Sequence, residues 1–187
     1  ARVAAGMGAD VTVFDVDVAR MRYIDEVWGG RIGTRFSSPL AVREACGESD
    51  VVIGSVLVPG ARTPHLVDHE MVLGMRPGSV LVDVAVDQGG CFEDSHPTTH
   101  ADPTFVVGGS VFYCVANMPG AVPHTSTYAL TNATMRYVLL LADEGWRGAC
   151  VARGDLRCGL ATHGGKLLSA PVGEALGIEC VPVSEVL

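Results

Sequence analysis

The chain has 187 residues, a formal net charge of −8, 48% hydrophobic residues and only 18% charged ones, with a mean hydropathy of +0.32. The acidic balance and the lack of a basic stripe argue against a nucleic acid or an anionic membrane as a partner, and no apolar run approaches the roughly 20 residues of a membrane span. The length suffices for one domain with a core, or one domain plus a fragment of a second. Such an apolar chain is expected to bury part of its surface against a partner.

The cysteines and histidines bear on compartment and metal binding. No C-x-x-C pair occurs, and the six cysteines are Cys46, Cys91, Cys114, Cys150, Cys158 and Cys180. Most lie in apolar surroundings, so we expect buried, reduced thiols of a cytoplasmic protein rather than a disulfide framework. His65 and His69, like His96 and His100, are four residues apart and could share a helix face. Because no Cys, Asp or Glu completes either pair, we expect no metal site.

The first elements are typical of the crossover part of a nucleotide-binding βαβ unit. Ala1–Met7 reads as a helix ended by Gly8, and the short apolar strand Val11–Phe14 stops at Asp15. In a dinucleotide-binding unit an acidic residue in this place lies about 20 residues beyond the first glycine of G-x-G-x-x-G and binds the adenosine ribose. Only fourteen residues precede Asp15, so we expect the glycine loop and the first strand upstream of this chain. The alternative is a turn-forming Asp after a strand.

The residues after Asp15 favour NAD over NADP. Val16 and Asp17 stand where an NADP enzyme would place an Arg for the 2′-phosphate. Arg20 lies one helical turn further on, where its side chain could instead cover the adenine.

Strand-like and helix-like segments then alternate. They are a helix over Val18–Val27 ended by Gly29 and Gly30, a strand over Arg31–Phe36, a helix over Pro39–Cys46, a strand over Asp50–Leu57, the loop Val58-Pro59-Gly60 and a helix over about Val67–Met75. Strands that alternate with helices of about ten residues predict a parallel sheet of the Rossmann type. The predicted fold class is therefore α/β, with a partial doubly wound parallel sheet.

The segment Arg76–Gly90, RPGSVLVDVAVDQGG, is the most informative stretch. A turn at Pro77-Gly78 precedes an apolar run over Ser79–Val86, which predicts a strand buried on both faces. Polarity returns at Asp87. Ligands of open parallel sheets lie outside the carboxyl ends of the strands, where two glycines would let the backbone approach closely. Asp87 is therefore our leading candidate for a working carboxylate, and a turn-forming Asp is the alternative.

Two further strands are predicted after a polar loop, over Thr104–Val107 and Val111–Val115. The second ends in Ala-Asn-Met-Pro, which puts Asn117 at the same predicted sheet edge as Asp87.

A long apolar helix is predicted from Thr125, its expected N-cap, to about Gly145. The tail over Val151–Leu187 has a glycine-rich turn at Gly164-Gly165 and a short helix around Pro171–Leu176, with nothing that looks catalytic.

Together these segments resemble the alanine dehydrogenase family. The resemblance begins at Gly8 and is densest in DVVIGSVLVPG (Asp50–Gly60), RPGSVLVDVAVDQGGCFE (Arg76–Glu93), PTTHADPTF (Pro97–Phe105), YCVANMPGAVP (Tyr113–Pro123) and TSTYALTNAT (Thr125–Thr134). The NAD-binding part of proton-translocating transhydrogenase is similar in the RPGSVLVD portion. It is not expected to combine DQGG with ANMPGAVP.

The resemblance implies an NAD-dependent enzyme that interconverts L-alanine with pyruvate and ammonia. Asp15 would hold the adenosine ribose, and Asp87 would be the catalytic carboxylate that orients or deprotonates water or the amino group. The implied cofactor-binding residues are Asp15, Arg20, Ser37, Val56, Leu57, Val84, Asp87, Asn117 and Met118, and the implied substrate-binding residue is Asn117.

The resemblance also divides the chain and names its partners. It implies an incomplete NAD-binding domain over residues 1–123 and, over residues 124–187, a connecting helix and a tail that return to a substrate domain. The family's substrate-binding Arg and Lys and its catalytic His belong to that N-terminal domain, which we expect to be supplied in cis or in trans. His96 and His124 stand where the family usually has Arg or Lys. The expected partners are L-alanine or pyruvate and further copies of the chain, since the family tends to form hexamers.

Two alternatives remain open. The chain could be a non-catalytic remnant that at most binds nucleotide or assembles with related chains, or the NAD-binding subunit of a transhydrogenase.

Overall fold

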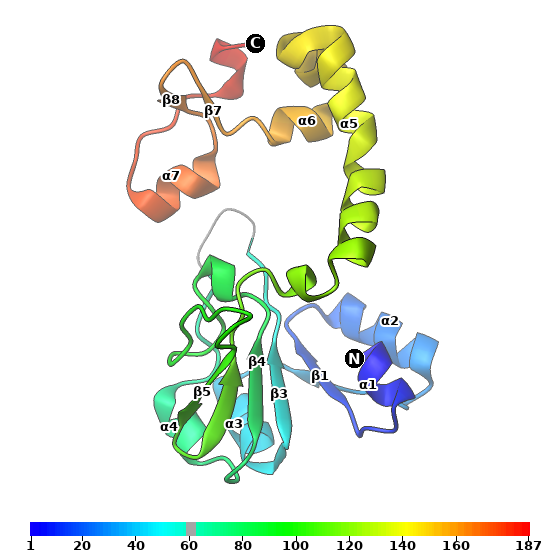
Figure 1. Ribbon diagram of the computed structural model, residues 1–187, viewed down its shortest axis with the longest axis vertical. Helices are drawn as coiled ribbons and strands as arrows, with labels where there is room; N and C mark the ends of the chain where they lie inside the picture. The colour runs from blue at the N-terminus through cyan, green and yellow to red at the C-terminus, as the bar shows by residue number, and fades with distance from the viewer. Residues whose placement is uncertain (59–62) are drawn as a thin grey trace.

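The computed structural model describes residues 1–58 and 63–187 and has the predicted α/β architecture (Figure 1). Pro59 and Gly60 of the predicted loop lie outside the described residues. The elements are α1 (Arg2–Gly6), β1 (Thr12–Asp15), α2 (Val18–Trp28), β2 (Gly33–Phe36), α3 (Pro39–Glu48), β3 (Val51–Gly54), α4 (His69–Leu73), β4 (Val80–Asp83), the 3-10 turn η1 (Val86–Gln88), β5 (Thr104–Val107), β6 (Ser110–Tyr113), η2 (Met118–Ala121), α5 (Pro123–Ala152), α6 (Gly154–Cys158), β7 (Thr162–His163), β8 (Lys166–Leu167), α7 (Ala170–Leu176) and η3 (Val183–Glu185).

The predicted parallel sheet is confirmed, but it is divided. β1 pairs in parallel with β2, with Asp15 opposite Phe36. β3, β4 and β6 are parallel neighbours in a second sheet of order β3-β4-β6-β5, in which β5 runs antiparallel to β6. The carboxyl ends of β3, β4 and β6 therefore lie at one edge of this sheet.

The core packs α3 and α4 and the segment after β4 against the second sheet. Leu81 of β4 and Phe112 of β6 are fully buried. The ring of Phe112 meets Phe92 edge-on, with centroids 6.1 Å apart, and stacks with Phe105 at 5.0 Å. Val72 of α4 belongs to the same buried cluster. Burying such side chains stabilises a fold by about 1.5–3 kcal/mol each.

Several predicted strands are too long. The run Ser79–Val86 does not stay extended, because β4 ends at Asp83 and the chain turns into η1. Oδ1 of Asp83 accepts the backbone N–H of Ala85 at 3.0 Å, a local bond that competes with extension of the ladder. β3 likewise ends at Gly54 instead of Leu57, and β6 ends at Tyr113 instead of Val115.

The histidine pairs do not share helix faces, although their spacing would have allowed it. Asp68 caps α4 by accepting the N–H of Met71 at 2.8 Å, so His69 is the first helical residue and His65 precedes the helix. His96 and His100 both lie in the loop before β5. Within residues 1–58 and 63–187, no three His, Cys, Asp or Glu side chains are grouped closely enough to hold a metal ion.

All six cysteines are free, and four of them are buried. Burial of Cys46, Cys91, Cys114 and Cys150 agrees with the expectation of thiols in apolar surroundings, whereas Cys158 is exposed. No helix in the described part of the chain is both long enough and apolar enough to cross a membrane.

α5 starts earlier than predicted. It begins at Pro123, and its N-cap is Val122, which makes no side-chain capping bond, so Thr125 lies inside the first turn. Proline suits the first helical position because the N–H it lacks would have no partner there. The predicted end is better placed, since Gly145 breaks the helix with φ 66° and ψ 167°.

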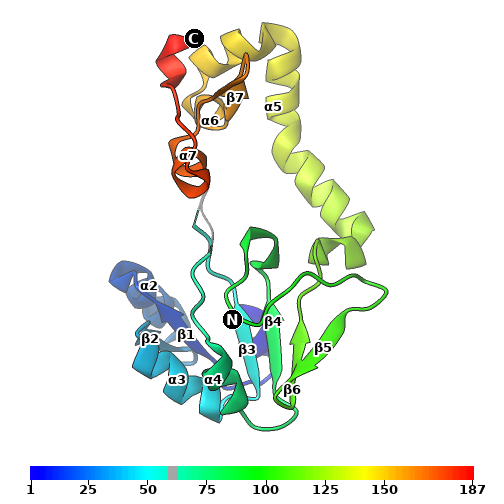
Figure 2. The same cartoon turned by 90° about the vertical axis from the view of Figure 1, so that its left-hand side faces the viewer.

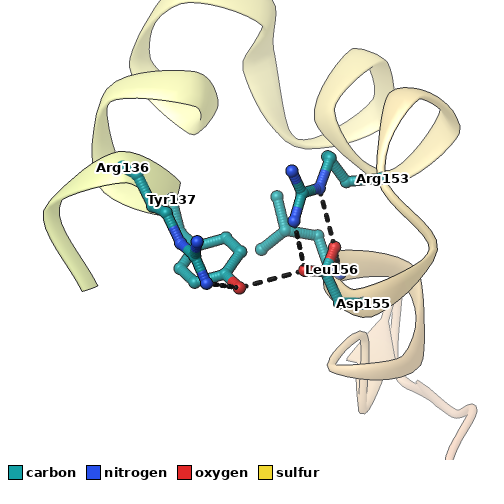
Figure 3. A network of polar contacts seen from close by, with 5 residues as sticks. All are labelled: Arg136, Tyr137, Arg153, Asp155 and Leu156. Carbon is teal, nitrogen blue, oxygen red and sulfur yellow. Dashed lines mark hydrogen bonds and ion pairs between the residues drawn. The ribbon is translucent and has the colours of Figure 1, made fainter. Parts of the chain in front are cut away.

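The C-terminal segment stands away from the sheets in both views (Figures 1 and 2). Figure 3 shows how α6 is tied to α5. Asp155 accepts bonds from Arg153 (2.6 and 3.0 Å) and from the hydroxyl of Tyr137 (3.0 Å). The bond from Arg153 holds the pKa of Asp155 well below its usual range. The expected turn at Gly164-Gly165 joins β7 to β8, and the expected short helix is α7.

The surface keeps many large apolar side chains, as the composition suggested. Val51 and Ile53 of β3 are 53% and 55% exposed. On α5 the exposed residues include Tyr128, Leu130 and Leu139.

Candidate functional site

The candidate site lies at the carboxyl ends of the parallel strands, because nearly all the predicted site residues end or follow a strand there. Asp15 ends β1 and Ser37 follows β2. The remaining strand-end residues are Val56 and Leu57 after β3, Val84 and Asp87 after β4, and Asn117 and Met118 after β6.

Asp15 and Ser37 are neighbours. The N–H of Ser37 donates to the backbone oxygen of Asp15 at 2.9 Å, which continues the β1–β2 ladder. The half-buried Asp15 carboxylate accepts the N–H of Asp17 at 2.9 Å. The Asp15 carboxylate therefore lies at the end of β1, two residues before Asp17, the N-cap of α2.

Asp17 is a structural residue that the sequence reading considered only for cofactor choice. Its carboxylate accepts the N–H of Ala19 at 2.8 Å and of Arg20 at 3.1 Å, which caps α2. The exposed guanidinium of Arg20 lies 5.1 Å from the ring centre of Tyr23. An Asp directly before an apolar-periodic run was the available signal for the cap.

Thr63 links the segment after β3 to η1, and sequence reasoning missed it. Its hydroxyl donates to the backbone oxygen of Val56 at 3.4 Å, and its N–H donates to the oxygen of Gln88 at 2.9 Å. Thr63 is 4% exposed, whereas Leu57 is 62% exposed. Nothing in the local pattern distinguishes this Thr from a loop residue.

Asp87 is an exposed carboxylate in the single turn η1, not the last residue of a strand. The turn ends at Gly89, which has φ 102°. Val84, four residues after the start of β4, is 53% exposed and donates its N–H to the oxygen of Gly54 at 2.8 Å. The side chains of Val84 and Asp87 are thus both open to solvent beyond β4.

Asn117 has a strained backbone. Its angles are φ 56° and ψ 53°. Among residues 1–58 and 63–187, it is the one residue other than glycine that has a positive φ. This conformation costs about 1–2 kcal/mol, and Asn tolerates it better than most residues. Its backbone oxygen accepts the N–H of Gly120 at 2.9 Å and faces Nε2 of His100 at 3.1 Å. Asn117 is the N-cap of η2, four residues after β6 ends, and backbone strain of this kind is often found at functional positions.

The strands bring the predicted residues into two groups. β4 and β6 are parallel, with Val82 opposite Tyr113, so the segments that carry Asp87 and Asn117 leave the second sheet at the same edge, as expected. Asp15 and Ser37 belong to the β1–β2 sheet. In the described structure, no hydrogen bond joins a predicted site residue of the first group to one of the second.

Asp83 is a buried carboxylate that the sequence reading treated as part of a strand. It is 0% exposed and accepts hydrogen bonds from Ala85, Cys91, Phe92 and Ser95. An acidic residue inside an apolar run was the available signal, because a buried carboxylate needs hydrogen-bond donors.

The thiols beside Asp83 are poor nucleophiles. Burial raises the pKa of Cys91 and of Cys114, and the nearby carboxylate of Asp83 adds to both shifts. The reactive form of Cys is the thiolate, which a raised pKa disfavours. A proton-accepting carboxylate at the strand ends is therefore the chemistry that this region offers.

A hollow in the C-terminal segment contains none of the predicted site residues. It is lined by the β7–β8 hairpin and by residues such as Leu176 and Glu179. The strand ends, which carry the predicted site residues, therefore remain the candidate site.

The comparisons with known proteins match most or all of this chain. The family model described as "Alanine dehydrogenase/PNT, C-terminal domain" matches residues 1–170. Over 187 residues, covering 100% of this chain and 50% of each relative, the chain is 59% identical to an alanine dehydrogenase of Mycolicibacterium smegmatis, 56% to one of Mycobacterium tuberculosis and 54% to one of Halomonas elongata. The chain thus spans about half the length of the curated relatives it matches.

Solved structures are also similar in fold, and two of them are compared with this chain. An L-alanine dehydrogenase matches with a TM-score of 0.82 and 45% identity, covering 94% of this chain and 48% of that one. A transhydrogenase from Sinorhizobium meliloti matches with a TM-score of 0.65 and 26% identity, covering 89% of this chain and 44% of that one.

Proposed function

Because this chain belongs to the alanine dehydrogenase/PNT C-terminal domain family, we propose that it is the NAD-binding half of an NAD-dependent alanine dehydrogenase. The reaction would be the reversible oxidative deamination of L-alanine to pyruvate and ammonia. The observation that carries the proposal is 59% identity over all 187 residues to a protein named alanine dehydrogenase. The geometry supports it, since the residues with the required chemistry follow the carboxyl ends of parallel strands, where open α/β sheets bind ligands.

The residues at the first sheet fit the adenosine end of NAD. The half-buried carboxylate of Asp15 follows β1, with Ser37 bonded beside it. A carboxylate in this place suits the two ribose hydroxyls, which are hydrogen-bond donors. Arg20, in the first turn of α2, is close enough along the chain to lie over the adenine. The pyrophosphate would need the glycine loop of the other half.

The residues at the second sheet fit the nicotinamide end and the substrate. Nicotinamide would supply the hydride acceptor. The backbone around Val56 and Leu57 would lie under this end of the cofactor, and Val84 and Met118 would contact the ring. Asn117 would hold the substrate through its amide.

Asp87 would be the catalytic carboxylate. As an exposed acceptor beyond β4, it can take a proton from the substrate amino group or from water, or hold that group in position by a hydrogen bond. A carboxylate in this place would also stabilise positive charge on a neighbouring ring. The remaining substrate-binding and proton-transfer groups would come from the N-terminal half.

The divided sheet supports the proposed domain organisation. β1 and β3 are both parallel-sheet strands, and each pairs with a neighbour on one side in the described structure. We propose that the first strand of the dinucleotide-binding unit fits between β1 and β3 and joins residues 1–123 into one NAD-binding domain. Residues 124–187, with α5 and the segment tied to it by Asp155, would then connect to the substrate domain.

The experiment is to join this chain to the N-terminal half of the Mycolicibacterium smegmatis relative, giving what we call the fused protein. Alanine-dependent NADH formation and pyruvate- and ammonia-dependent NADH oxidation are measured for the fused protein and for each half alone. We expect both reactions only in the fused protein. A folded fused protein with no rate above that of either half would contradict the proposal.

A transhydrogenase subunit is the second candidate, because the matching family model covers both kinds of protein. The alanine dehydrogenase structure is nevertheless the nearer of the two in sequence, at 45% against 26% identity.

Assembly would take the form of a homo-oligomer, for which the exposed apolar side chains of α5 provide surface.

A further inference from the structure

Asp83 is buried at the end of β4, and the proposed function gives it no role. Its exposed fraction is 0%, although it carries an acidic side chain. Removing a carboxylate from water is unfavourable unless other donors replace the lost hydration. The structure supplies these donors from the segment between Ala85 and Ser95.

The loop between Ala85 and Cys91 contains η1 and Asp87, and Asp83 binds both of its ends. Oδ1 accepts the N–H of Ala85 at 3.0 Å. Oδ2 accepts the N–H of Cys91 at 2.8 Å and the hydroxyl of Ser95 at 2.5 Å. One side chain therefore closes the base of the loop and also holds the segment that follows it.

Gly90 shows how closely the loop and the carboxylate fit. It has φ 83°, and a Cβ there would lie 2.8 Å from Oδ2 of Asp83 and 2.9 Å from Cβ of Ser95. Its N–H donates to the oxygen of Ala85 at 3.1 Å. Gly90 is therefore needed for close packing within the protein. The sequence-based interpretation had given both Gly89 and Gly90 the role of letting a ligand approach the backbone.

We propose that Asp83 is a positioning residue, which fixes the loop from Ala85 to Cys91 and through it the side chain of Asp87. The proposal rests on the proposed function, in which Asp87 is the catalytic carboxylate. Asp83 is fully buried and bonded to the loop backbone, so it acts on the reaction through Asp87. A catalytic group displaced by about 1 Å can lower a rate by about 100-fold.

The first test compares Asp83→Asn with Asp94→Asn in the fused protein. The amide that replaces the Asp83 carboxylate presents a donor where the loop N–H groups need an acceptor, so one end of the loop is released. Asp94 is the matched control, because it pairs with His69 at 3.0 Å and makes no bond to the loop. We expect kcat to fall at least about tenfold in Asp83→Asn with KM for NAD changed less than about twofold, and Asp94→Asn to keep kcat within about twofold.

A second comparison asks whether the effect passes through Asp87. In an Asp87→Asn background, Asp83→Asn should lower kcat no further, because the group that it positions is already gone. An equal fall in both backgrounds, or no fall in either, would overturn the proposal. If Asp83→Asn does not fold, Ser95→Ala removes one of the donors. It should lower kcat only when Asp87 is present, and an unchanged kcat would overturn the proposal.

Hydrogen exchange separates this proposal from the proposed function. In the 187-residue chain itself, Asp83→Asn should speed exchange of one of the Ala85 and Cys91 amides at least about tenfold relative to Asp94→Asn, because asparagine keeps one acceptor oxygen and the other amide loses its partner. Unchanged exchange refutes the role of Asp83 even if the fused protein is active. Faster exchange together with an inactive unmutated fused protein refutes the proposed function and leaves the anchoring of the loop in place.

Discussion

The fit between Gly90 and Asp83 predicts that Gly90→Ala destabilises the chain more than an equivalent change elsewhere. Gly78→Ala is the matched control, since Gly78 has φ 88° and a Cβ there would meet no atom within 4 Å. Both changes force alanine into the left-handed region, which costs about 1–2 kcal/mol. At Gly90 alone the new methyl would also lie 2.8 Å from Oδ2 of Asp83, and such overpacking costs about 1–3 kcal/mol more.

We therefore expect losses of about 2–5 kcal/mol for Gly90→Ala and about 1–2 kcal/mol for Gly78→Ala. The assay is urea unfolding of the 187-residue chain, with the free energy of unfolding taken from linear extrapolation. Equal losses in the two variants would refute the close packing of this loop on Asp83.

Three further predictions follow from the strand ends and the loop beside them. Asp87→Asn in the fused protein should lower turnover at least about 100-fold and keep NADH affinity, measured by fluorescence titration; unchanged turnover would remove Asp87 from the mechanism. Asn117→Gly should stabilise the chain by up to about 1 kcal/mol in urea unfolding because the strain is relieved, while lowering turnover because the amide is lost; equal turnover would show that the side chain is not used. The hydrogen bond and charge of Asp94 raise the pKa of His69. The stability that the pair contributes is therefore present below the ordinary pKa of about 6.5 and is lost as pH rises through the raised pKa. An NMR titration should show a lower pKa for His69 in Asp94→Asn, and an unchanged pKa would contradict the pairing.

The order and type of most elements could be predicted from the sequence because local patterns determine them. β5 has the predicted bounds, Thr104–Val107, and α2 differs from its prediction only at the last residue. The glycines that end α2 and break α5 have the positive φ angles that only glycine adopts easily. Parallel pairing follows from the alternation of strands and helices.

The end of β4 could not be predicted in this way. The donors that hold Asp83 lie 2, 8, 9 and 12 residues further along the chain, so no local pattern reveals them. An apolar run with one acidic residue therefore looked like a strand up to Val86.

The candidate site shows the same limit. The position of Asp15 at the end of β1 and of Asn117 after β6 was predictable, because polar residues follow apolar runs there. The left-handed backbone of Asn117, the bridge made by Thr63 and the turn around Asp87 depend on contacts between loops. These features were visible only in the folded chain.

The central claim is that a nicotinamide ring binds at the edge of the sheet where β4 and β6 end. A crystal structure of the fused protein with NADH tests it most directly. We predict that the ring contacts the segments that carry Asp87 and Asn117, with the adenosine ribose at Asp15. A ring bound elsewhere, with these side chains out of contact with the cofactor, would contradict the account.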